Sequence, residues 1–453
     1  MRVRFLFGLV LIAVAGGLLA TPGAARGWQL ATIRRLSVTS TGAEVNGASR
    51  NVDASADAQY VVFESAASNL VTGDTNSRLD VFLHDRTAGT TTRVSVASDG
   101  TQGNGDSRAP AISADGRFIA FESLASNLVS GDTNQMRDIF VYDRETGQSS
   151  RVSVGAAGVQ ANQHSESADL SGDGRYIVFK SFARNLVSED TNIQGDIFLH
   201  DRQSSTTTRV SVASNGAQSN GLSSSPVISR DGTTVAFESN ASNLTPTNTN
   251  ILTKIFIRDL TANQTRDVTL SMGNAQSSNG PAFHPSISAD GRFIAFDSAA
   301  SNIVPNDMNE SYDIFVHDQG TRVTLLVSLT QDGAQTNSAS SNPVISDDGQ
   351  HVAFVSLASN LVTGDSNGKT DIFLQELGRR HTVRVSLADN GTQSDGTSDG
   401  PMLAREGAAI AVLFESDARN LVPSDMNGVR DIFITAAAGN PPGTQLYLPV
   451  AIR

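Results

Sequence analysis

Apolar and polar residues alternate with a period of two along most of the chain, which is typical of β-strands with one buried face. One stretch shows the whole arrangement, in four successive segments: Ala109–Ser113, Arg117–Ser123, Asp138–Asp143 and Ser149–Val154. An Asp-Gly turn separates the first two segments, a polar loop the next two, and a second turn the last two. The pattern predicts four antiparallel strands in this stretch.

The same arrangement recurs along the chain. The phrase Ser113–Ser123, which reads Ser-Ala-Asp-Gly-Arg-Phe-Ile-Ala-Phe-Glu-Ser, returns in variants at Ser55–Ser65, Ser171–Ser181, Ser229–Ser239, Ser288–Ser298 and Ser346–Ser356, and with two extra residues at Ala404–Ser416. Its last Phe falls at Phe63, Phe121, Phe179, Phe237, Phe296, Phe354 and Phe414, so the units are 58 to 60 residues apart. Seven such units predict an all-β fold, a seven-bladed β-propeller with four-stranded antiparallel blades and long loops.

The phase of the repeat predicts how the ring closes. The fourth segment of the early units reads Arg-Val-Ser-Val, as in Arg93–Val96, and a similar phrase, Arg35–Val38, precedes the first unit. The seventh unit stops after its third segment, Asp431–Thr435. We therefore expect the N-terminal strand to complete the last blade and to remove a free sheet edge. The propeller is expected to span residues 31–436.

These repeats resemble those of TolB-like β-propellers, which belong to the wider WD-like class. The family pattern is Ser-x-Asp-Gly, a strand that ends in Ala-Phe-x-Ser, then Asp-Ile-Phe and an Asp-rich turn. Here it stands at Ser113–Ser123, Asp138–Phe140 and Asp143–Arg144. The resemblance implies a rigid propeller that usually serves binding, and it implies no particular activity because propellers host many functions.

The ends of the chain differ from the repeats. Residues 1–25 carry Arg2 and Arg4, an apolar run from Phe5 to Ala20 and small residues after it, which predicts a secretory signal peptide. A membrane anchor is the alternative, but the run is short for a bilayer span. Residues 437–453 form a Pro- and Gly-containing linker and a short apolar tail, which is either a docking tag or a frayed end.

Composition narrows the classes of function. The chain has no Cys, which excludes disulfides, zinc–thiolate sites and a Cys nucleophile, and which suits an exported bacterial protein that folds without disulfides. Its net charge of −13 argues against nucleic-acid binding. We expect a monomer that is secreted, periplasmic or on the cell surface, with no transmembrane anchor after signal cleavage.

The loop between the second and third segments repeats the spacing Asp-x-Asn-x-x-x-Asp in six units. The residues are Asp74, Asn76 and Asp80; Asp132, Asn134 and Asp138; Asp190, Asn192 and Asp196; Asp307, Asn309 and Asp313; Asp365, Asn367 and Asp371; and Asp425, Asn427 and Asp431. Carboxylate and amide oxygens are ligands that Ca²⁺ prefers, so these loops are candidate calcium sites. The alternative is that Asp and Asn cap the backbone of the loops. The fourth unit has Asn248, Asn250 and Lys254 instead.

A catalytic site would be expected where the repeat is broken. His164 and Glu166 are unique to their unit, and Asp53 and Asp169 occupy a first-segment position that is Ala or Val in other units. These four residues are weak catalytic candidates, and satisfied polar residues near the channel are the alternative. His84, His200 and His317 share one repeat position, which we interpret as an exposed strand position. No nucleophile elbow, phosphate loop or dinucleotide fingerprint occurs in the sequence.

Together these features predict an exported, non-enzymatic binding or scaffold propeller of the bacterial cell envelope or exterior. Its face with the Asp-rich loops would be acidic and would engage a protein, peptide or glycan, with calcium as a possible stabilising ion and no other cofactor expected. The alternative is an enzyme that processes polysaccharide or peptide at the channel mouth. A third hypothesis is a calcium-stabilised structural module.

Overall fold

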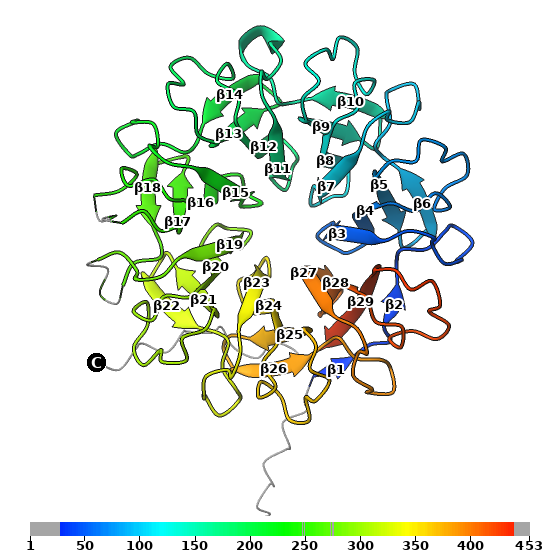
Figure 1. Ribbon diagram of the computed structural model, residues 1–453, viewed down its shortest axis with the longest axis vertical. Coiled ribbons are helices and arrows are strands. Elements are labelled where there is room, and N and C mark those ends of the chain that lie inside the picture. Colours follow the sequence, from blue (N-terminus) through cyan, green and yellow to red (C-terminus); the bar gives the residue numbers. More distant parts are fainter. Residues whose placement is uncertain (1–27, 247, 249, 272, 274–275, 439–453) are drawn as a thin grey trace, which may run out of the picture.

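Seven antiparallel sheets stand round a central channel, as the blades of a β-propeller (Figure 1). The computed structural model describes residues 28–438, apart from residues 247, 249, 272, 274 and 275. Within each blade the strands follow one another from the channel outwards in chain order. The predicted all-β fold, a seven-bladed propeller with four-stranded blades, is therefore confirmed.

Each blade has the same strand pattern, and blades 1 to 7 are numbered here in chain order. The innermost strands are β3 (Ser49–Ala54), β7 (Ser107–Ile112), β11 (Ser165–Leu170), β15 (Ser223–Ile228), β19 (Ala282–Ile287), β23 (Ser340–Ile345) and β27 (Ser398–Glu406). The second strands are β4 (Tyr60–Ser65), β8 (Phe118–Ser123), β12 (Tyr176–Ser181), β16 (Thr234–Ser239), β20 (Phe293–Ser298), β24 (His351–Ser356) and β28 (Ala409–Ser416).

The outer half of each blade holds the third and fourth strands. The third strands are β5 (Asp80–Asp85), β9 (Asp138–Asp143), β13 (Asp196–Asp201), β17 (Lys254–Asp259), β21 (Asp313–Asp318), β25 (Asp371–Glu376) and β29 (Asp431–Ala438). The fourth strands are β6 (Thr90–Arg93), β10 (Gln148–Arg151), β14 (Thr206–Arg209), β18 (Gln264–Asp267), β22 (Val323–Leu326) and β26 (His381–Arg384). A single 3₁₀ turn, Ala156–Gly158, is the only helical element in the described part of the chain.

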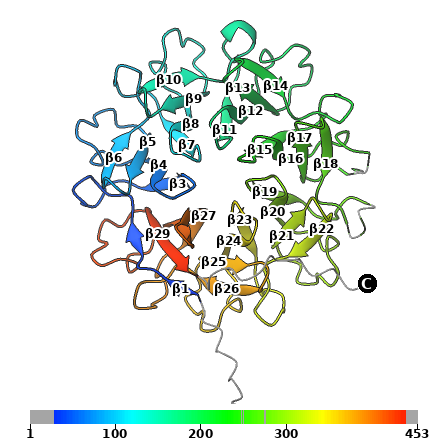
Figure 2. The ribbon, with the colours of Figure 1, turned by 180° about the vertical axis from the view of Figure 1, so that it is seen from behind.

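The N-terminal segment closes the ring. Two short strands, β1 (Gln29–Leu30) and β2 (Arg34–Arg35), pair antiparallel with β29 at the outer edge of blade 7, and Figures 1 and 2 show this from both sides. Arg35 pairs with Phe433 as Arg93 pairs with Phe82 in blade 1, so β2 stands where the fourth strand ends in other blades. The predicted closure is confirmed, and it covers an edge that would otherwise be open to other strands.

The core lies within and between the blades. In every blade the Phe of the second strand stacks on the Phe opposite it in the third strand, with ring centroids 5.6 to 6.2 Å apart. These rings are buried, and each apolar cluster joins side chains of neighbouring blades; Phe121 of blade 2, for example, lies with Val62 and Val81 of blade 1. Burial of such large rings between blades is a main source of stability in this ring.

The fourth strand is shorter than predicted from the Arg-Val-Ser-Val phrase. In blade 2 it ends at Arg151, and Ser153 lies beyond it with its side chain turned inward. The Ser153 hydroxyl donates to Asp138 Oδ1 at 2.5 Å and accepts the amide hydrogen of Ile139 at 3.1 Å. The repeated Ser therefore fastens the start of the third strand instead of extending the fourth.

The ring has two different faces. One, called here the loop face, carries the loops between second and third strands and the loops between blades. The other, the turn face, carries the turns between first and second strands, whose backbones form hydrogen bonds from blade to blade: Ala56 N–H to Ala114 O, Ala114 N–H to Gly172 O and Gly172 N–H to Arg230 O. These bonds link neighbouring blades at the turn face.

The expected signal peptide, residues 1–25, lies outside the described residues, as do residues 439–453 of the expected tail. Strand β29 continues to Ala438, two residues past the expected end of the propeller. Among the residues described, no helix has the length and apolar character needed to cross a bilayer.

Candidate functional site: the central channel and the loop face

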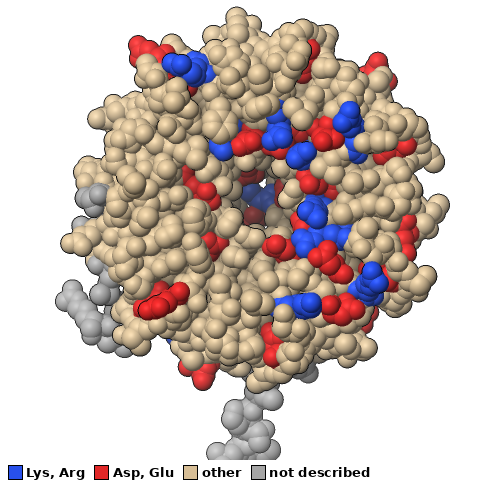
Figure 3. Space-filling view, viewed as in Figure 1, with Lys and Arg blue, Asp and Glu red and all other residues tan. Residues whose placement is uncertain are grey.

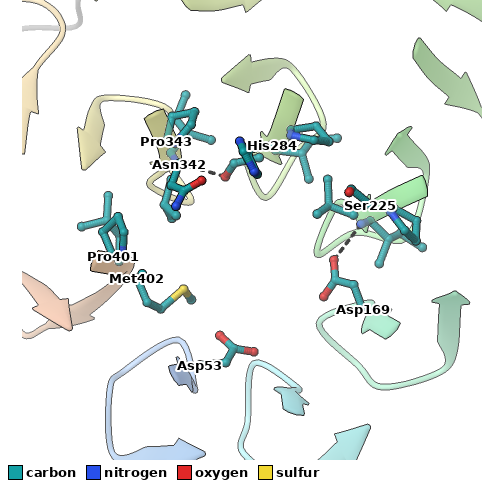
Figure 4. A pocket seen from close by; sticks show the side chains of 18 of the residues that line it. Asp53, Asp169, Ser225, His284, Asn342, Pro343, Pro401 and Met402 are labelled. Carbon is teal, nitrogen blue, oxygen red and sulfur yellow. Dashed lines mark hydrogen bonds between the residues drawn. The ribbon is translucent and has the colours of Figure 1, made fainter. Parts of the chain in front are cut away.

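The central channel contains a pocket of about 460 Å³, bordered by the innermost strands of all seven blades. Its walls are mainly apolar, with prolines such as Pro226, Pro285 and Pro343 and the side chain of Met402. Polar groups converge among them, as Figure 4 shows for Asp53, Asp169, Ser225, His284 and Asn342. An apolar pocket with a few fixed polar groups is typical of a binding site.

A backbone bulge in each innermost strand shapes the channel wall. The third residue of the strand has a positive φ of 47° to 55° in every blade; the residues are Asn51, Ala109, Ser167, Ser225, His284, Asn342 and Gly400. In most blades the bulge N–H donates to a carboxylate on the second strand of the preceding blade, as Ala109 N–H does to Glu64 at 2.8 Å. The bulges are therefore fixed from blade to blade, and their side chains have set directions.

His284 is the most strongly oriented ionisable group at the channel. Its Nδ1–H donates to Asp297 Oδ2 at 2.7 Å, and its backbone N–H donates to Glu238 at 2.9 Å. Asp297 is buried and also accepts the amide hydrogen of Asn342, whereas about half of the His284 side chain is exposed. The hydrogen bond that His284 donates to Asp297 raises the pKa of His284, so the imidazolium form is favoured. The pair presents one oriented, half-exposed ring to the channel.

Asp53 and Asp169 both line the pocket, and each carboxylate already has backbone partners. Asp53 accepts hydrogen bonds from the N–H groups of Ala54 and Ile112, and Asp169 accepts them from those of Leu170 and Ile228. All four bonds are 2.8 Å long. Each Asp thus links its innermost strand to the strand of the next blade. Burial raises the pKa of both groups, that of Asp169 to about 7.

His164 and Glu166 lie together at the loop-face end of blade 3. His164 Nδ1 accepts the amide hydrogen of Arg137 at 2.9 Å, and Glu166 pairs with Lys180 at 2.8 Å and Arg137 at 3.3 Å. Neither residue borders the pocket that holds Asp53 and Asp169. The structure therefore divides the four catalytic candidates into two pairs, each engaged in its own contacts.

The mouth of the channel has an uneven distribution of charge. Figure 3 shows basic side chains gathered along the upper and right-hand sides of the opening, and charged groups deeper in it. Arg108, Arg137, Lys180 and Arg430 lie in or beside strands of blades 2, 3 and 7 and form ion pairs there. At the turn face, Arg230 of blade 4 pairs with Asp347 of blade 6 at 2.6 Å. The two ends of the channel therefore differ in chemistry.

The repeated loop carboxylates are buried. The final Asp of the spacing is 0% exposed at Asp80, Asp138, Asp196, Asp313, Asp371 and Asp431. In five blades an Arg at the end of the fourth strand reaches between both carboxylates of the loop; the residues are Arg35, Arg93, Arg151, Arg209 and Arg384. The predicted acidic loop face is wrong in its basis, because these Asp side chains are covered, and in five blades paired with an Arg, instead of forming a negative surface.

These contacts bear on the calcium hypothesis. In blade 1, Arg93 Nη1 lies 3.2 Å from Asp80, 3.6 Å from Asp74 and 2.7 Å from Gln102 Oε1, so a guanidinium nitrogen stands where the oxygens converge. Asn76 donates to Asp80 and accepts the amide hydrogen of Arg78, which is the capping role considered as the alternative. Within the described residues, no group of three or more His, Cys, Asp or Glu side chains is placed to hold a metal ion.

His84, His200 and His317 are buried, which corrects the prediction that their strand position is exposed. Each Nδ1 forms a hydrogen bond with the Thr hydroxyl opposite it, Thr91, Thr207 or Thr324, at 2.9 to 3.0 Å. Burial lowers the pKa of all three rings, that of His317 to about 4. They are neutral structural residues at neutral pH.

Sequence reasoning missed Asp297 and Asn342 beside His284. Both occupy repeat positions: Asp297 stands where Glu64 and Glu122 stand in blades 1 and 2, and Asn342 stands where Asn51 does. A search for residues that break the repeat passes over them. The Ala-Phe-Asp-Ser variant of the phrase, at residues 295–298, was the available signal.

Comparisons with known proteins agree with the fold. No protein-family model and no curated protein sequence matches the chain. Among solved structures, an oligogalacturonate lyase in complex with manganese is similar over 92% of this chain and 98% of its own, with 15% identity and a TM-score of 0.53. TolB from Acinetobacter baumannii shares 14% identity over 74% of this chain and 77% of its own, with a TM-score of 0.38.

An acylaminoacyl peptidase from Pyrococcus horikoshii is also similar, with 12% identity and a TM-score of 0.48; the match covers 83% of this chain and half of the peptidase. At these identities the likenesses concern fold alone. The seven four-stranded blades confirm the fold that the repeat pattern and its resemblance to TolB-like propellers predicted. The protein is a seven-bladed β-propeller.

Proposed function

We propose that the protein is an exported, non-enzymatic binding propeller that receives a peptide or glycan segment in its central channel from the loop face. The observation that carries this proposal is the pocket itself. Its walls are mainly apolar, hydrogen bonds to the preceding blade fix the bulges at His284 and Asn342, and Asp53 and Asp169 each accept two backbone hydrogen bonds. Fixed polar groups in an apolar cavity favour recognition.

The channel entrance supports this direction of entry. The Arg230–Asp347 pair crosses the channel at the turn face, whereas at the loop face the ends of second strands are followed by exposed apolar side chains, among them Leu124, Phe182 and Leu357. These three follow the last Ser of their second strands, at one repeat position. They would contact the part of a ligand that remains outside the pocket.

Export to the envelope or exterior, the predicted location, rests on the N-terminal pattern and on the lack of Cys. N-terminal sequencing of the protein recovered outside the cytoplasm would test it, with cleavage expected after residue 25 or nearby. Calcium as a stabilising ion is part of the proposal for blade 5 only.

The binding proposal is tested by filling the channel. Met402 points into the pocket, so Met402→Trp should obstruct it, whereas Met426 is 81% exposed at a loop tip and Met426→Trp is a matched control. Peptides selected from a displayed 12-residue library, and glycans bound on an array, should bind the native protein and the control and be lost with Met402→Trp. Unchanged binding to Met402→Trp would overturn the proposal, and cleavage of bound ligands would establish the enzyme alternative.

A further inference from the structure

Every blade has a buried charged residue at the start of its third strand, and the residues around it differ from blade to blade. In five blades two loop carboxylates share an Arg, as Asp74 and Asp80 share Arg93. This Arg always comes from the same register position, opposite the Phe of the third strand: Phe82 faces Arg93 in blade 1. Burying two carboxylates side by side requires such a compensating positive charge.

Blade 4 keeps the compensation with the signs exchanged. Lys254 replaces the Asp at the start of the third strand, and Asp267 replaces the Arg opposite Phe256. The Lys254 ammonium is buried. It donates hydrogen bonds to the backbone carbonyl of Ser278 at 2.7 Å and to the Ser278 hydroxyl at 2.6 Å. The position therefore retains one acid and one base in this blade.

Blade 5 keeps both acids and loses the base. Asp307 and Asp313 are present and buried, but the residue opposite Phe315 is Leu326. Gln335, the counterpart of Gln102, donates through Nε2 to Asp307 at 3.0 Å. The structure shows no ion pair to either carboxylate from the described residues.

One oxygen at this site is left without a partner. Asp313 is 0% exposed, and its Oδ1 accepts hydrogen bonds from Ser328 at 2.5 Å and Thr336 at 3.2 Å. Its Oδ2 has no hydrogen-bond partner among the described residues, whereas the corresponding oxygen of Asp80 faces Asn76 and Arg93. A buried carboxylate oxygen without a partner lowers the stability of the fold. The corresponding oxygen in five other blades faces an Arg guanidinium.

We propose that blade 5 binds one Ca²⁺ ion between Asp307 and Asp313, at the position that a guanidinium holds in five other blades. Ca²⁺ accepts irregular sets of carboxylate, amide and water oxygens. Gln335 stands beside Asp307 with its Nε2 toward the carboxylate and its Oε1 accepting the amide hydrogen of Met308, so its amide would turn over to give the ion an oxygen. Mg²⁺ demands regular octahedral geometry and gives up its water reluctantly, so the same oxygens suit it less well. The site lies in the wall of blade 5 and does not depend on what the channel binds.

Calorimetric titration of chelator-treated protein with Ca²⁺ tests the proposal. We expect one site per chain and a rise in melting temperature on adding Ca²⁺. Leu326→Arg restores the residue type of the other blades, and it should abolish the heat of binding and raise the melting temperature of the metal-free protein. Val323→Arg adds the same charge at the other end of β22 and should bind Ca²⁺ as the native protein does.

Asp307→Asn provides a second variant that changes no volume, and it should weaken Ca²⁺ binding at least tenfold. The absence of both heat and a melting shift up to about 10 mM Ca²⁺ would overturn the proposal, because even weak extracellular calcium sites fill at that concentration. Binding that persists unchanged in Leu326→Arg and in Asp307→Asn would overturn it as well, by placing the ion elsewhere.

Discussion

Single repeat positions in this ring hold different residues that perform the same task. Asp53 and Asp169 accept the N–H of the next blade's innermost strand, and Ser286 of blade 5 accepts the N–H of Ile345 in the same way at 3.1 Å. An ionisable and a neutral side chain thus form the same link. The carboxylate differs in one respect, which is that its burial makes the link sensitive to pH.

We predict that Asp169→Ser removes part of this sensitivity. Native Asp169 has a pKa raised to about 7, whereas an unfolded Asp titrates near 4, so between these values the folded state binds more protons. Its contribution to stability is full below about pH 4 and is lost as the pH rises to about 7. The melting temperature of Asp169→Ser relative to the native protein should therefore increase from pH 4 to pH 7 and then level off. A difference that stays constant with pH would contradict this.

The loop carboxylates show why the sequence alone misled at the residue scale. Their spacing matches oxygen ligands, yet the residue that neutralises them lies 13 positions further on, as Arg93 does after Asp80. That Arg was visible in the sequence as the first residue of a strand phrase. Only the pairing of the third and fourth strands brings it between the carboxylates.

At the scale of the element, the strands whose alternation repeats in all seven units could be predicted well. Strand β9 runs from Asp138 to Asp143, as expected, and Ser123 ends β8 as expected. The fourth strands end earlier than the alternation predicts. The Ser of the Arg-Val-Ser-Val phrase continues the alternating pattern, but its hydroxyl donates to the Asp that begins the third strand, as Ser153 does to Asp138. The alternation of apolar and polar positions does not distinguish a Ser that makes this hydrogen bond from a Ser within a strand.

The turn between first and second strands also packs against the neighbouring blade. Gly116 of blade 2 has φ of +73°, and a methyl group there would lie 2.2 Å from the Tyr60 ring of blade 1, which Arg144 covers from 4.1 Å. We predict that Gly116→Ala lowers the free energy of unfolding by about 2 kcal/mol or more, through backbone strain and displacement of the ring. Chemical denaturation followed by circular dichroism measures this.

Gly131→Ala is the control, because Gly131 has φ of +75° but no other atom lies within 4 Å of the added methyl group. It should lose about 1 kcal/mol, which is the backbone part alone. Equal losses in the two variants would show that the contact with Tyr60 contributes nothing.

At the scale of the whole molecule, the ring is held by strands from opposite ends of the chain. The short pairings of β1 and β2 with β29, together with side-chain contacts such as that of Ser37 with Asp431, close blade 7, and the chain has no Cys. Opening of this contact would expose the edge of β29. The closure, unlike the blade-5 charge site, could be predicted from the sequence because it needs only the phase of the repeat.

We predict that a disulfide between Gln29→Cys and Ala438→Cys raises the melting temperature. These exposed residues are direct cross-strand partners, and the bond would link the ends of a very long loop, which in the chain-entropy model is worth about 5 kcal/mol. The gain should vanish on reduction and be absent from each single-Cys variant. An oxidised protein with an unchanged melting temperature would show that unfolding does not start at the closure.

The pairing of β1 with β29 also determines the orientation of the ring relative to anything attached to its ends. Gln29 and Ala438 lie side by side, at the end of β29 that is remote from the loop before Asp431, and therefore on the turn-face side of blade 7. A tether or fusion partner joined to the ring at Gln29 or at Ala438 would therefore be attached at the same place on its turn-face side. In both cases the channel mouth on the loop face would be turned outward and left unobstructed.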